Sequence, residues 1–409
     1  MVAGASVAAA SPTAGTVEMR DDVGNLMGTT TGADAVRDAL ALVTTSRVGD
    51  TVPWAITIGA GTYGDFAVTQ RNLTIAGDPA SGAVISGMGI TDDTSGGCVR
   101  ITRGNVTLDG ITCRGATKTG IVATPPNGEG GLVVRNVAIE AAGADGISAI
   151  GGTGIVIQNA VITDPKRSGI RLASLTAAGP YAVVGGSVTG AAANGLELDD
   201  DVTKLSVTGL AISGTKGSGV LSNDAGNSDL TLQGVTVASG AKDGINFGGG
   251  GLRLAVRDSV VTGNAGAGIR MAEGTGFAVS GFTLDGSNGG GDLLFTADDR
   301  TGGAYTGLQA GGGFSLPGDP YAVRISAARA ALPASAGGRA RSGAALSIAA
   351  TANTAKRRLV VRFDAGGTVW RGAGKWGKVN TSRRIRGGAQ ALLGTSYLGT
   401  ASALYAPFG

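Results

Sequence analysis

The chain has 409 residues, of which 75 are glycine, about two and a half times the usual share. The glycines and the 11 prolines follow no Gly-X-Y period, which excludes collagen. The sequence contains no run of about 18 apolar residues, so no membrane span is predicted. The net charge is +3, with two cysteines and no histidine. A metal site of the His/Cys kind is therefore not expected, and no cofactor is predicted.

Charge is unevenly distributed along the chain. Residues 321–409 contain 14 basic residues and one acidic residue, whereas residues 1–320 contain 19 basic and 29 acidic residues. This asymmetry predicts two functional regions.

The N-terminal part predicts an arm, a helix and then strands. Residues 1–32 are mostly small and predict an extended arm that is ordered only against a partner. Val36, Leu40 and Val43 have helical spacing, so residues 33–43 predict a short helix that covers the open end of a solenoid. In residues 54–77 alternating apolar residues predict strands, and glycines predict corners.

A repeat occupies the middle of the chain. The dipeptide Gly-Ile, or a close variant, returns every 23 to 26 residues at Gly120, Gly146, Gly169, Gly195, Gly219, Gly244 and Gly268. A second apolar motif runs half a period out of phase, and each copy ends in Gly, Asn or Asp. Units of this length with two or three short strands cannot bury an apolar face alone. Stacked as coils about 4.8 Å apart, they pair each strand with its equivalents.

The repeat predicts which residues face the core. One core column comes directly after the glycines, because the corner needs a conformation or a closeness that a Cβ forbids: Ile147, Ile170, Leu196, Val220, Ile245 and Ile269. A second column comes from the other motif: Val134, Ile157, Val184, Val207, Leu232, Val256 and Val279. At the second corner Asn136, Asn159 and Asp258 replace Gly, which predicts a left-handed backbone there. Asn72 and Asn105 are interpreted as turn residues as well.

These motifs carry a resemblance. A helical cap, then Ile-x-Ile-x-x-Gly-x-Tyr at residues 56–63, Asn-Leu-Thr-Ile-x-Gly at residues 72–77 and coils of about 24 residues resemble the pectate-lyase-like superfamily. Within it the chain resembles the phage tail-spike or tail-fibre-like kind, over about residues 33–300. The resemblance implies an all-β, right-handed single-stranded parallel β-helix with a short N-terminal capping helix. A separate small β-rich module is predicted after it.

The predicted organisation has five parts. Residues 1–32 are the arm, residues 33–52 the capping helix and lead-in, and residues 53–300 a β-helix of about ten coils. Residues 301–320 are a Gly-rich linker, and residues 321–409 are the basic module, with strands at residues 345–350 and 358–363. The uncharged residues 387–409 are predicted to bury themselves in a partner or a neighbouring subunit.

The residue after each inward isoleucine points outward, and this rule selects candidate site residues. Glu197 and Asp199 lie two apart on one strand, so both carboxylates project from one face. One carboxylic acid can protonate a glycosidic oxygen while the other acts as base or nucleophile. The remaining residues of this face are predicted to bind the substrate: Arg171, Asn223, Asn246 and Arg270. The alternative is a solvated charged surface or a passive contact with a glycan.

The resemblance also implies a lyase alternative, in which an Arg or Lys abstracts a proton beside a uronate carboxylate and acids hold calcium. The short arginine motif of pectate lyases has no counterpart in this sequence.

The C-terminal module contains an aromatic and basic loop at residues 370–378, and an arginine cluster lies after it. Tryptophans interleaved with basic residues can bind nucleic acid or acidic glycan. The favoured interpretation is that the tryptophans pack a small β domain while the arginines bind an acidic partner, without nucleic acid. The predicted partner-binding residues are Trp370, Trp376, Arg383, Arg384 and Arg386. Cys98 and Cys113 are interpreted as free core thiols one coil apart.

Three functions remain open. The first is a virion protein of a phage or prophage, homotrimeric, bound to other virion proteins and in contact with a host-surface polysaccharide. The second is a polysaccharide lyase or glycoside hydrolase, in which case the location is extracellular. The third is a surface or appendage spacer without activity.

Overall fold

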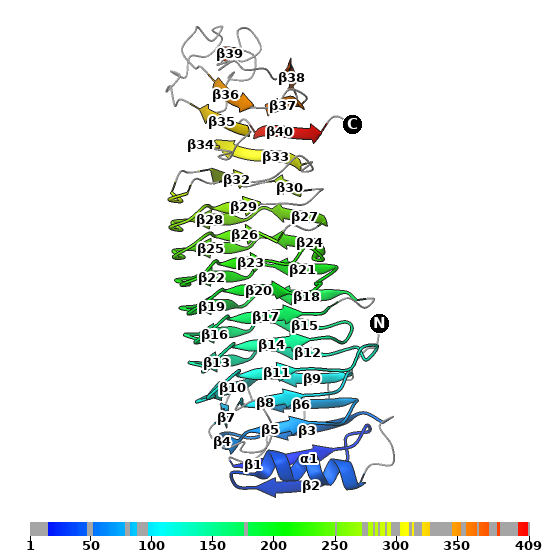
Figure 1. The fold of residues 1–409 in the computed structure, drawn as a ribbon. Helices are drawn as coiled ribbons and strands as arrows, with labels where there is room; N and C mark the ends of the chain where they lie inside the picture. Colours follow the sequence, from blue (N-terminus) through cyan, green and yellow to red (C-terminus); the bar gives the residue numbers. More distant parts are fainter. Residues whose placement is uncertain are drawn as a thin grey trace, which may run out of the picture. The chain divides into compact units, whose positions relative to one another are not determined.

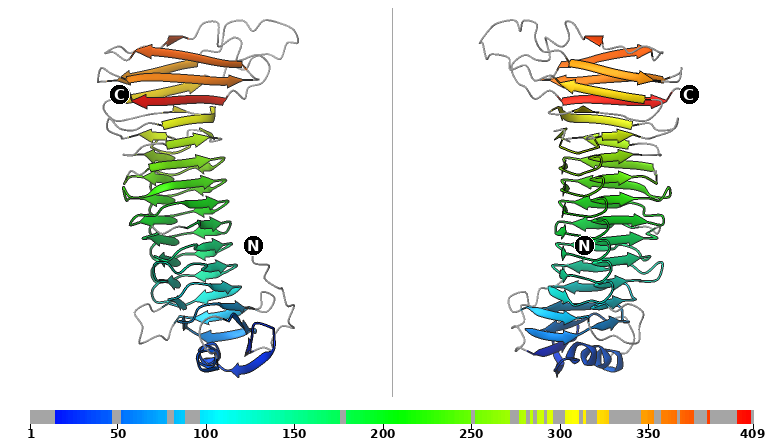
Figure 2. Two further views of the ribbon diagram at one scale, coloured as in Figure 1. Left: turned by 90° about the vertical axis from the view of Figure 1, so that its right-hand side faces the viewer. Right: turned by 60° about the vertical axis from the view of Figure 1, so that its left-hand side comes forward.

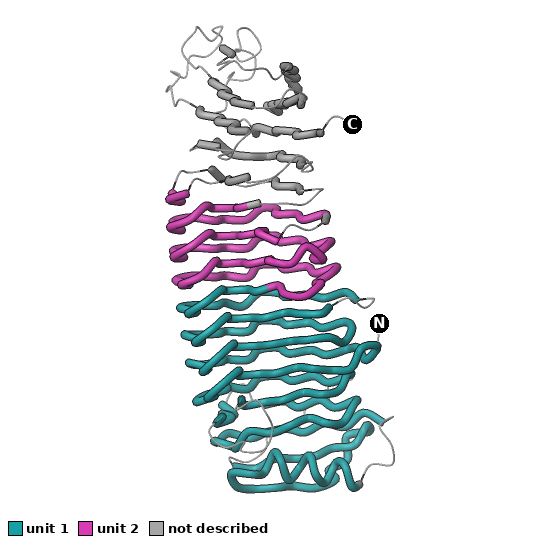
Figure 3. Tube along the Cα trace, viewed as in Figure 1, with its two compact units in different colours: residues 1–197 teal, residues 198–409 magenta. Residues whose placement is uncertain are grey.

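Figure 1 shows the computed structural model of the chain. It describes residues 15–46, 52–77, 82–87, 97–175, 179–249 and 252–271, and beyond them short segments that are almost all strands. The chain divides into two compact units, residues 1–197 and residues 198–409 (Figure 3). Each unit is described by itself below.

In the first unit each coil contributes one strand to each of three parallel sheets, here named sheets A, B and C. Sheet A contains β3 (Trp54–Ile58), β6 (Leu73–Gly77), β9 (Val106–Asp109), β12 (Val133–Arg135), β15 (Val156–Gln158) and β18 (Tyr181–Val184). Sheet B contains β4 (Gly61–Gly64), β7 (Ala83–Ser86), β10 (Ile111–Arg114), β13 (Ala138–Glu140), β16 (Val161–Thr163) and β19 (Ser187–Thr189). Sheet C contains β5 (Phe66–Val68), β8 (Val99–Ile101), β11 (Ile121–Ala123), β14 (Ile147–Ile150) and β17 (Ile170–Ala173).

The second unit repeats this arrangement, and β20 (Leu196–Asp199) contains the boundary between the units. Its part of sheet A contains β21 (Leu205–Thr208), β24 (Ser228–Gln233), β27 (Leu252–Arg257), β30 (Phe277–Ser280) and β31 (Thr283–Leu284). Its part of sheet B contains β22 (Ala211–Ser213), β25 (Thr236–Ala238) and β28 (Val260–Thr262). Its part of sheet C contains β23 (Val220–Ser222), β26 (Ile245–Phe247), β29 (Ile269–Met271) and β32 (Leu293–Phe295). The predicted parallel β-helix is confirmed.

The N-terminal segment closes the first coil. The predicted helix is confirmed as α1 (Ala35–Ser46), and its apolar stripe Val36, Leu40 and Val43 is buried. The predicted arm is wrong for its described part, because β1 (Thr16–Arg20) and β2 (Leu26–Thr31) form an antiparallel hairpin. β1 pairs with β3, so the chain itself orders this segment. The hairpin and α1 lie together beside the first coils in each view of Figures 1 and 2.

The segments after the solenoid also form strands. The predicted linker contains β33 (Gly303–Ala310), which pairs with β30 and β31, and β34 (Gly313–Phe314). β37 (Arg357–Ala365) lies between β38 (Thr368–Lys375) and β40 (Thr400–Pro407) in antiparallel pairing. β35 (Tyr321–Ala327) and β36 (Leu346–Ala352) pair with each other, and their outer neighbours are β34 and β39 (Arg383–Arg384).

Two predicted strands of the module are thus confirmed, at β36 and β37. The burial of the uncharged tail in a partner or a neighbouring subunit stays a prediction; in the structure its strand β40 pairs with β33 and β37 of its own chain. Backbone groups of a strand need hydrogen-bond partners, and composition alone does not reveal which strand supplies them.

Among the residues whose burial the structure describes, the core contains the predicted inward columns, with one correction; Val279 lies outside those residues. Ile147 pairs in register with Ile170, and both are fully buried. In the second column Ile157 lies opposite Val183, which is 1% exposed, whereas the predicted Val184 is 37% exposed. The sequence Val-Val-Gly-Gly fits the repeat in two registers, because either Gly185 or Gly186 can occupy the left-handed corner. Both glycines have positive φ in the structure. Burial of Val183 selects the register.

Close approach between coils explains the glycine of each Gly-Ile pair. These glycines lack positive φ. A Cβ built on Gly169 would overlap a methyl group of Val188 and lie 2.7 Å from the carbonyl oxygen of Gly195, one coil further on. The same conflict with the next glycine's carbonyl occurs at Gly120, Gly146, Gly219 and Gly244.

The second corner is left-handed as predicted. Asn136, Asn159 and Asp258 have φ of 52°, 51° and 48°, the region that Asn and Asp tolerate best among non-glycine residues. Asn72 and Asn105 also have positive φ, which confirms them as turn residues. The side chains link adjacent coils, since Asn159 Nδ2 donates to Asn136 Oδ1 at 3.1 Å.

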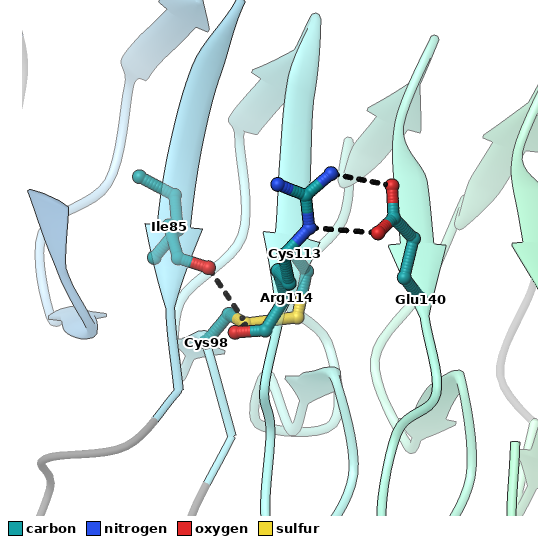
Figure 4. Close-up of a disulfide and its surroundings, with 5 residues drawn as sticks. All are labelled: Ile85, Cys98, Cys113, Arg114 and Glu140. Carbon is teal, nitrogen blue, oxygen red and sulfur yellow. Dashed lines mark hydrogen bonds and ion pairs between the residues drawn. A yellow bond between two sulfur atoms is a disulfide. The ribbon is translucent and has the colours of Figure 1, made fainter. Parts of the chain in front are cut away.

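The cysteines are not free thiols. Cys98 and Cys113 form a disulfide, and both are fully buried (Figure 4). They lie 15 residues apart within one coil, Cys98 just before β8 and Cys113 in β10. The prediction is wrong because the number of cysteines does not show that sheets B and C bring these two positions together across the core.

Candidate functional site

A row of polar side chains lies at the corner that precedes the strands of sheet C. It occupies the position before the glycine of each Gly-Ile pair, which in the first unit is Thr119, Asp145, Ser168 and Asn194. Asp145 is 2% exposed and Ser168 is fully buried. Sequence reasoning missed this row, although the recurrence of polar residues at one step of the repeat was a usable signal.

Two members of the row cap a backbone N–H group one coil further on. Asp145 Oδ1 accepts the N–H of Ser168 at 3.0 Å, and Ser168 Oγ accepts the N–H of Asn194 at 3.4 Å. These bonds satisfy donors that the corner would otherwise leave buried and unpaired. The row therefore has a structural role, and any binding or catalytic role of these residues would be additional to it.

Glu197, predicted to be catalytic, is held by this row. Its Oε2 accepts hydrogen bonds from the hydroxyl of Ser168 and from Asn194 Nδ2, the latter at 3.2 Å. Glu197 is half-buried on the outward face of β20. Ser168 thus connects two carboxylates, since its N–H bonds Asp145 and its hydroxyl bonds Glu197.

Asp145 carries the unusual electrostatics of this cluster. Burial raises its pKa above the ordinary aspartate value, and the charge of Glu197 acts in the same direction. The N–H of Ser168 and the charges of Arg167 and Arg171 oppose the rise in pKa without cancelling it. Arg167 Nη1 lies 3.5 Å from Asp145 Oδ2. The predicted Arg171 therefore belongs to the surroundings of Asp145.

Asp199 has a different partner from Glu197. Its side chain is half-buried and lies on the same face of β20. With the amide of Asn223 in the orientation that satisfies its hydrogen bonds, Asn223 Nδ2 donates to Asp199 Oδ1 at 3.2 Å and to the carbonyl oxygen of Leu198 at 3.3 Å. Asn223, which was predicted to bind the substrate, thus bonds to the carboxylate of Asp199 in the same chain.

In the second unit the predicted residues Asn246 and Arg270 meet on Asp243, which is 5% exposed. Asp243 Oδ2 accepts from Arg270 Nε at 2.6 Å and from Asn246 Nδ2 at 2.8 Å. Asp243 Oδ1 accepts from Arg270 Nη2 at 3.1 Å and from the N–H of Ala267 at 2.7 Å. Asp243 occupies the same repeat position as Asp145, yet its charge is balanced by a two-pronged ion pair.

Of the predicted partner-binding residues of the C-terminal module, some lie on strands and the others lie outside the residues that the structure describes. Trp370 lies in β38, where a loop was predicted, and Arg383 and Arg384 form β39. Trp376 and Arg386 lie outside the described residues. Within the part of the chain that is described, no three acidic or cysteine side chains are grouped to hold a metal ion. No described helix is long and apolar enough to cross a membrane.

The fold and a family model define the class of this protein. A model described as a right handed beta helix region matches residues 126–288. This match covers less than half of the chain, and the parallel sheets of both units have the fold that it describes, a right-handed parallel β-helix. None of the curated proteins matches the sequence.

Several solved structures are similar to the chain at low sequence identity. The A-module of the mannuronan C-5 epimerase AlgE6 of Azotobacter vinelandii is 14% identical with a TM-score of 0.52, covering 68% of this chain and 84% of that one. The surface adhesin PfbA of Streptococcus pneumoniae is 9% identical with a TM-score of 0.45, covering 68% and 85%. The catalytic unit of a GH87 α-1,3-glucanase from Streptomyces thermodiastaticus is 16% identical with a TM-score of 0.34, covering 67% and 66%. One fold can host unrelated functions, so function has to be argued from this chain's own residues.

Proposed function

We propose that the chain is a tail-spike or tail-fibre-like structural protein of a phage or prophage virion, whose sheet C contacts a host-surface polysaccharide. The observation that carries the proposal is the hydrogen bonding of Glu197. Its carboxylate is half-buried and oriented by Ser168 and Asn194, and it interacts with Asp145, on which the charge of Arg171 also acts.

A carboxylate held in this way suits binding better than proton transfer. Two of its acceptor sites are occupied by protein donors, and the others remain for sugar hydroxyls. Because Glu197 is already oriented, a ligand loses little affinity to the entropy of ordering that side chain. Coils about 4.8 Å apart repeat along the sheet, which suits an extended polymer.

The proposed assembly is a homotrimer bound to other virion proteins, and the proposed location is the virion. The Cys98–Cys113 disulfide supports a final location in oxidising surroundings, where such bonds persist. An extracellular protein outside a particle is the alternative location.

Binding of intact bacteria and isolated surface polysaccharides to the purified full chain tests the proposal, together with the mass of the assembly from light scattering. Arg171→Gln and Glu197→Gln should each weaken glycan binding by about tenfold, the loss of one charge-assisted contact. Arg135→Gln is the matched control, since Arg135 pairs with Asp109 on sheet A. A monomer that binds no cell, particle or glycan would contradict the proposal. Equal adsorption by the wild type and both variants would instead support a spacer.

A second candidate, a polysaccharide lyase or hydrolase, is favoured by the raised pKa of Asp145. A general acid needs a raised pKa, and burial and the charge of Glu197 both act on Asp145 in that direction. In this function Asp145 is the acid and Glu197 the base or nucleophile, in place of the pair Glu197 and Asp199 predicted from sequence. Product release from acidic and neutral bacterial glycans would support it, provided that Asp145→Asn or Glu197→Gln abolishes the release. Absence of product from every glycan excludes it.

A further inference from the structure

The dipeptide Asn-Gly occurs three times in the sequence, at residues 127–128, 194–195 and 288–289. Asparagine followed by glycine is especially prone to deamidation, because glycine has no side chain that hinders its backbone nitrogen. All three pairs lie in the part of the chain that the structure describes. Their surroundings can therefore be compared.

Deamidation needs no enzyme and no cofactor. The backbone nitrogen of the glycine attacks the side-chain carbonyl carbon of the asparagine. The new C–N bond closes a five-membered succinimide ring, and the side-chain nitrogen takes the proton of the attacking N–H and leaves as ammonia. Water then opens the ring at one of its two carbonyl groups, which gives an aspartate or an isoaspartate. The slow step requires that the two reacting atoms can approach each other.

The first pair lies in an open turn between β11 and β12. Asn127 and Gly128 are both exposed. The N–H of Glu129 donates to the carbonyl oxygen of Pro126 at 3.0 Å, which closes the turn. Gly128 has a φ of 89°, and a Cβ built on it would meet no described atom within 4 Å. The turn can thus bring the nitrogen of Gly128 to the side chain of Asn127 without displacing a neighbour.

The turn is anchored where it ends. Glu129 Oε2 accepts the backbone N–H of Gly104 at 2.8 Å. Glu129 Oε1 accepts from Arg103 Nη1 at 3.0 Å and also from Arg71 Nη2. Because these contacts do not involve Asn127, we expect the chain to stay folded after the reaction.

The pair at residues 288–289 is held by hydrogen bonds on both reacting groups. Asn288 is 4% exposed. Its Oδ1 accepts from the N–H and from Nδ2 of Asn264 at 3.1 and 2.9 Å, and its Nδ2 donates to the carbonyl oxygen of Val261 at 2.9 Å. The N–H of Gly289, which would have to attack, donates to the carbonyl oxygen of Asn264 at 2.9 Å.

The pair at residues 194–195 is held as well. Asn194 Nδ2 donates to Glu197 Oε2 at 3.2 Å, and the N–H of Asn194 donates to Ser168 Oγ at 3.4 Å. Gly195 is buried. Both held pairs would have to break hydrogen bonds before the ring can close, so each should react at least about tenfold more slowly than a free pair.

We propose that Asn127 is a site of spontaneous deamidation and that the folded structure selects it from the three Asn-Gly pairs. The product carries a new carboxylate on the exposed turn between sheets C and A, and an isoaspartate also adds a methylene group to the backbone there. The inference goes beyond the proposed function and does not depend on it.

The experiment is incubation of the purified full chain in mildly alkaline buffer, followed by digestion with trypsin and mass spectrometry. Cleavage after lysine and arginine places the three pairs in three separate peptides. The peptide with Asn127 should convert from amide to acid at least about tenfold faster than the other two. A parallel incubation in urea is the control, because the three peptides should convert at similar rates in the unfolded chain.

A variant provides a second measurement. Isoelectric focusing of the incubated wild type should show a new acidic form, and Asn127→Gln should lack it, because glutamine would have to close a less favourable six-membered ring. Thermal melting identifies a variant that fails to fold, and the comparison of the wild-type peptides needs no variant.

Three outcomes would overturn the inference. The first is conversion at equal rates at the three pairs of the folded chain, or at none of them while the chain in urea converts. The second is the same preference for Asn127 in urea, because the folded structure would then not select the site. The third is an acidic form that folded Asn127→Gln produces as fast as the wild type.

Discussion

At the scale of single residues, the corner before sheet C imposes a steric requirement on the glycine of the Gly-Ile pair. It imposes an electrostatic requirement on the residue before that glycine. The glycine of each repeat lets adjacent coils approach closely, and the residue before it can cap a backbone N–H of the next coil. The same position holds Asp145, whose pKa is raised, and Asp243, which is balanced by Arg270. The same structural position thus has different neighbours in the two units, and Arg270 makes a two-point ion pair with Asp243.

Gly169→Ala tests the steric requirement. The added Cβ would overlap Val188 and press on the carbonyl oxygen of Gly195, so we expect a loss of about 1–3 kcal/mol in the free energy of unfolding. Urea denaturation followed by circular dichroism measures it. Gly64→Ala is the control, since its nearest neighbour would be 3.5 Å away, an ordinary contact. Equal stability of the two variants would contradict the explanation.

Asp145→Asn tests the electrostatic requirement through pH. Because the pKa of Asp145 is raised in the folded chain, the folded state binds more protons than the unfolded state between about pH 3.9 and the raised pKa. The contribution of this group to stability therefore falls as pH rises through that window and is constant above it. Asparagine does not titrate, so the difference in unfolding free energy between variant and wild type should shift in favour of the variant across this window. A difference that does not change with pH in that range would show that Asp145 has an ordinary pKa.

At the scale of elements, the first coils are tied together by more than strand pairing. The hairpin β1–β2 pairs with β3, and the Cys98–Cys113 disulfide links sheets B and C inside one coil. On the surface Arg114 forms a bidentate pair with Glu140 one coil further on. Such exposed pairs contribute little, so the disulfide and the buried strands dominate the stability of this region.

Reduction of the disulfide should destabilise the chain by about 3 kcal/mol, the loop entropy expected for a closed loop of 15 residues. Urea unfolding with and without reductant measures the change, and alkylation followed by mass measurement counts the thiols. The double variant Cys98→Ser with Cys113→Ser should be as unstable as the reduced chain and insensitive to reductant. Two alkylated thiols in the untreated folded protein would refute the disulfide.

At the scale of the whole molecule, a solenoid has open ends whose backbone groups and apolar residues need a cover. In the first unit β1 supplies it, with Val17 and Met19 almost fully buried, and α1 adds its apolar stripe. The chain thereby protects the edge of β3 without a partner.

Removal of residues 1–31 should expose that edge and cause aggregation, because an unpaired apolar strand is a template for other chains. Light scattering at increasing protein concentration measures this effect. Removal of residues 1–14 alone leaves β1 and β2 intact and should not change the assembly. If the longer deletion has the same mass per chain and solubility as the shorter one, the capping role is excluded.

The amino-acid sequence is sufficient to predict the fold and the direction of most side chains. The 23- to 26-residue period specifies which residues point inward, since coils stack in register, and the prediction for Ile147 and Ile170 is confirmed. The left-handed corners at Asn136, Asn159 and Asp258 result from local backbone preferences. The same local rule is ambiguous at Gly185 and Gly186, and there the predicted core residue Val184 is wrong.

The contacts of the candidate residues, in contrast, depend on the tertiary structure. Ser168 holds Glu197, Arg270 pairs with Asp243, and two arginines converge on Glu129, in each case between residues 26 to 58 positions apart. The disulfide and the pairing of β1 with β3 likewise join segments that lie apart in the sequence. A periodic sequence specifies the direction of most side chains, because direction is a property of one coil. The partners of that side chain lie on other coils, and they depend on how the coils are stacked and how each corner is built.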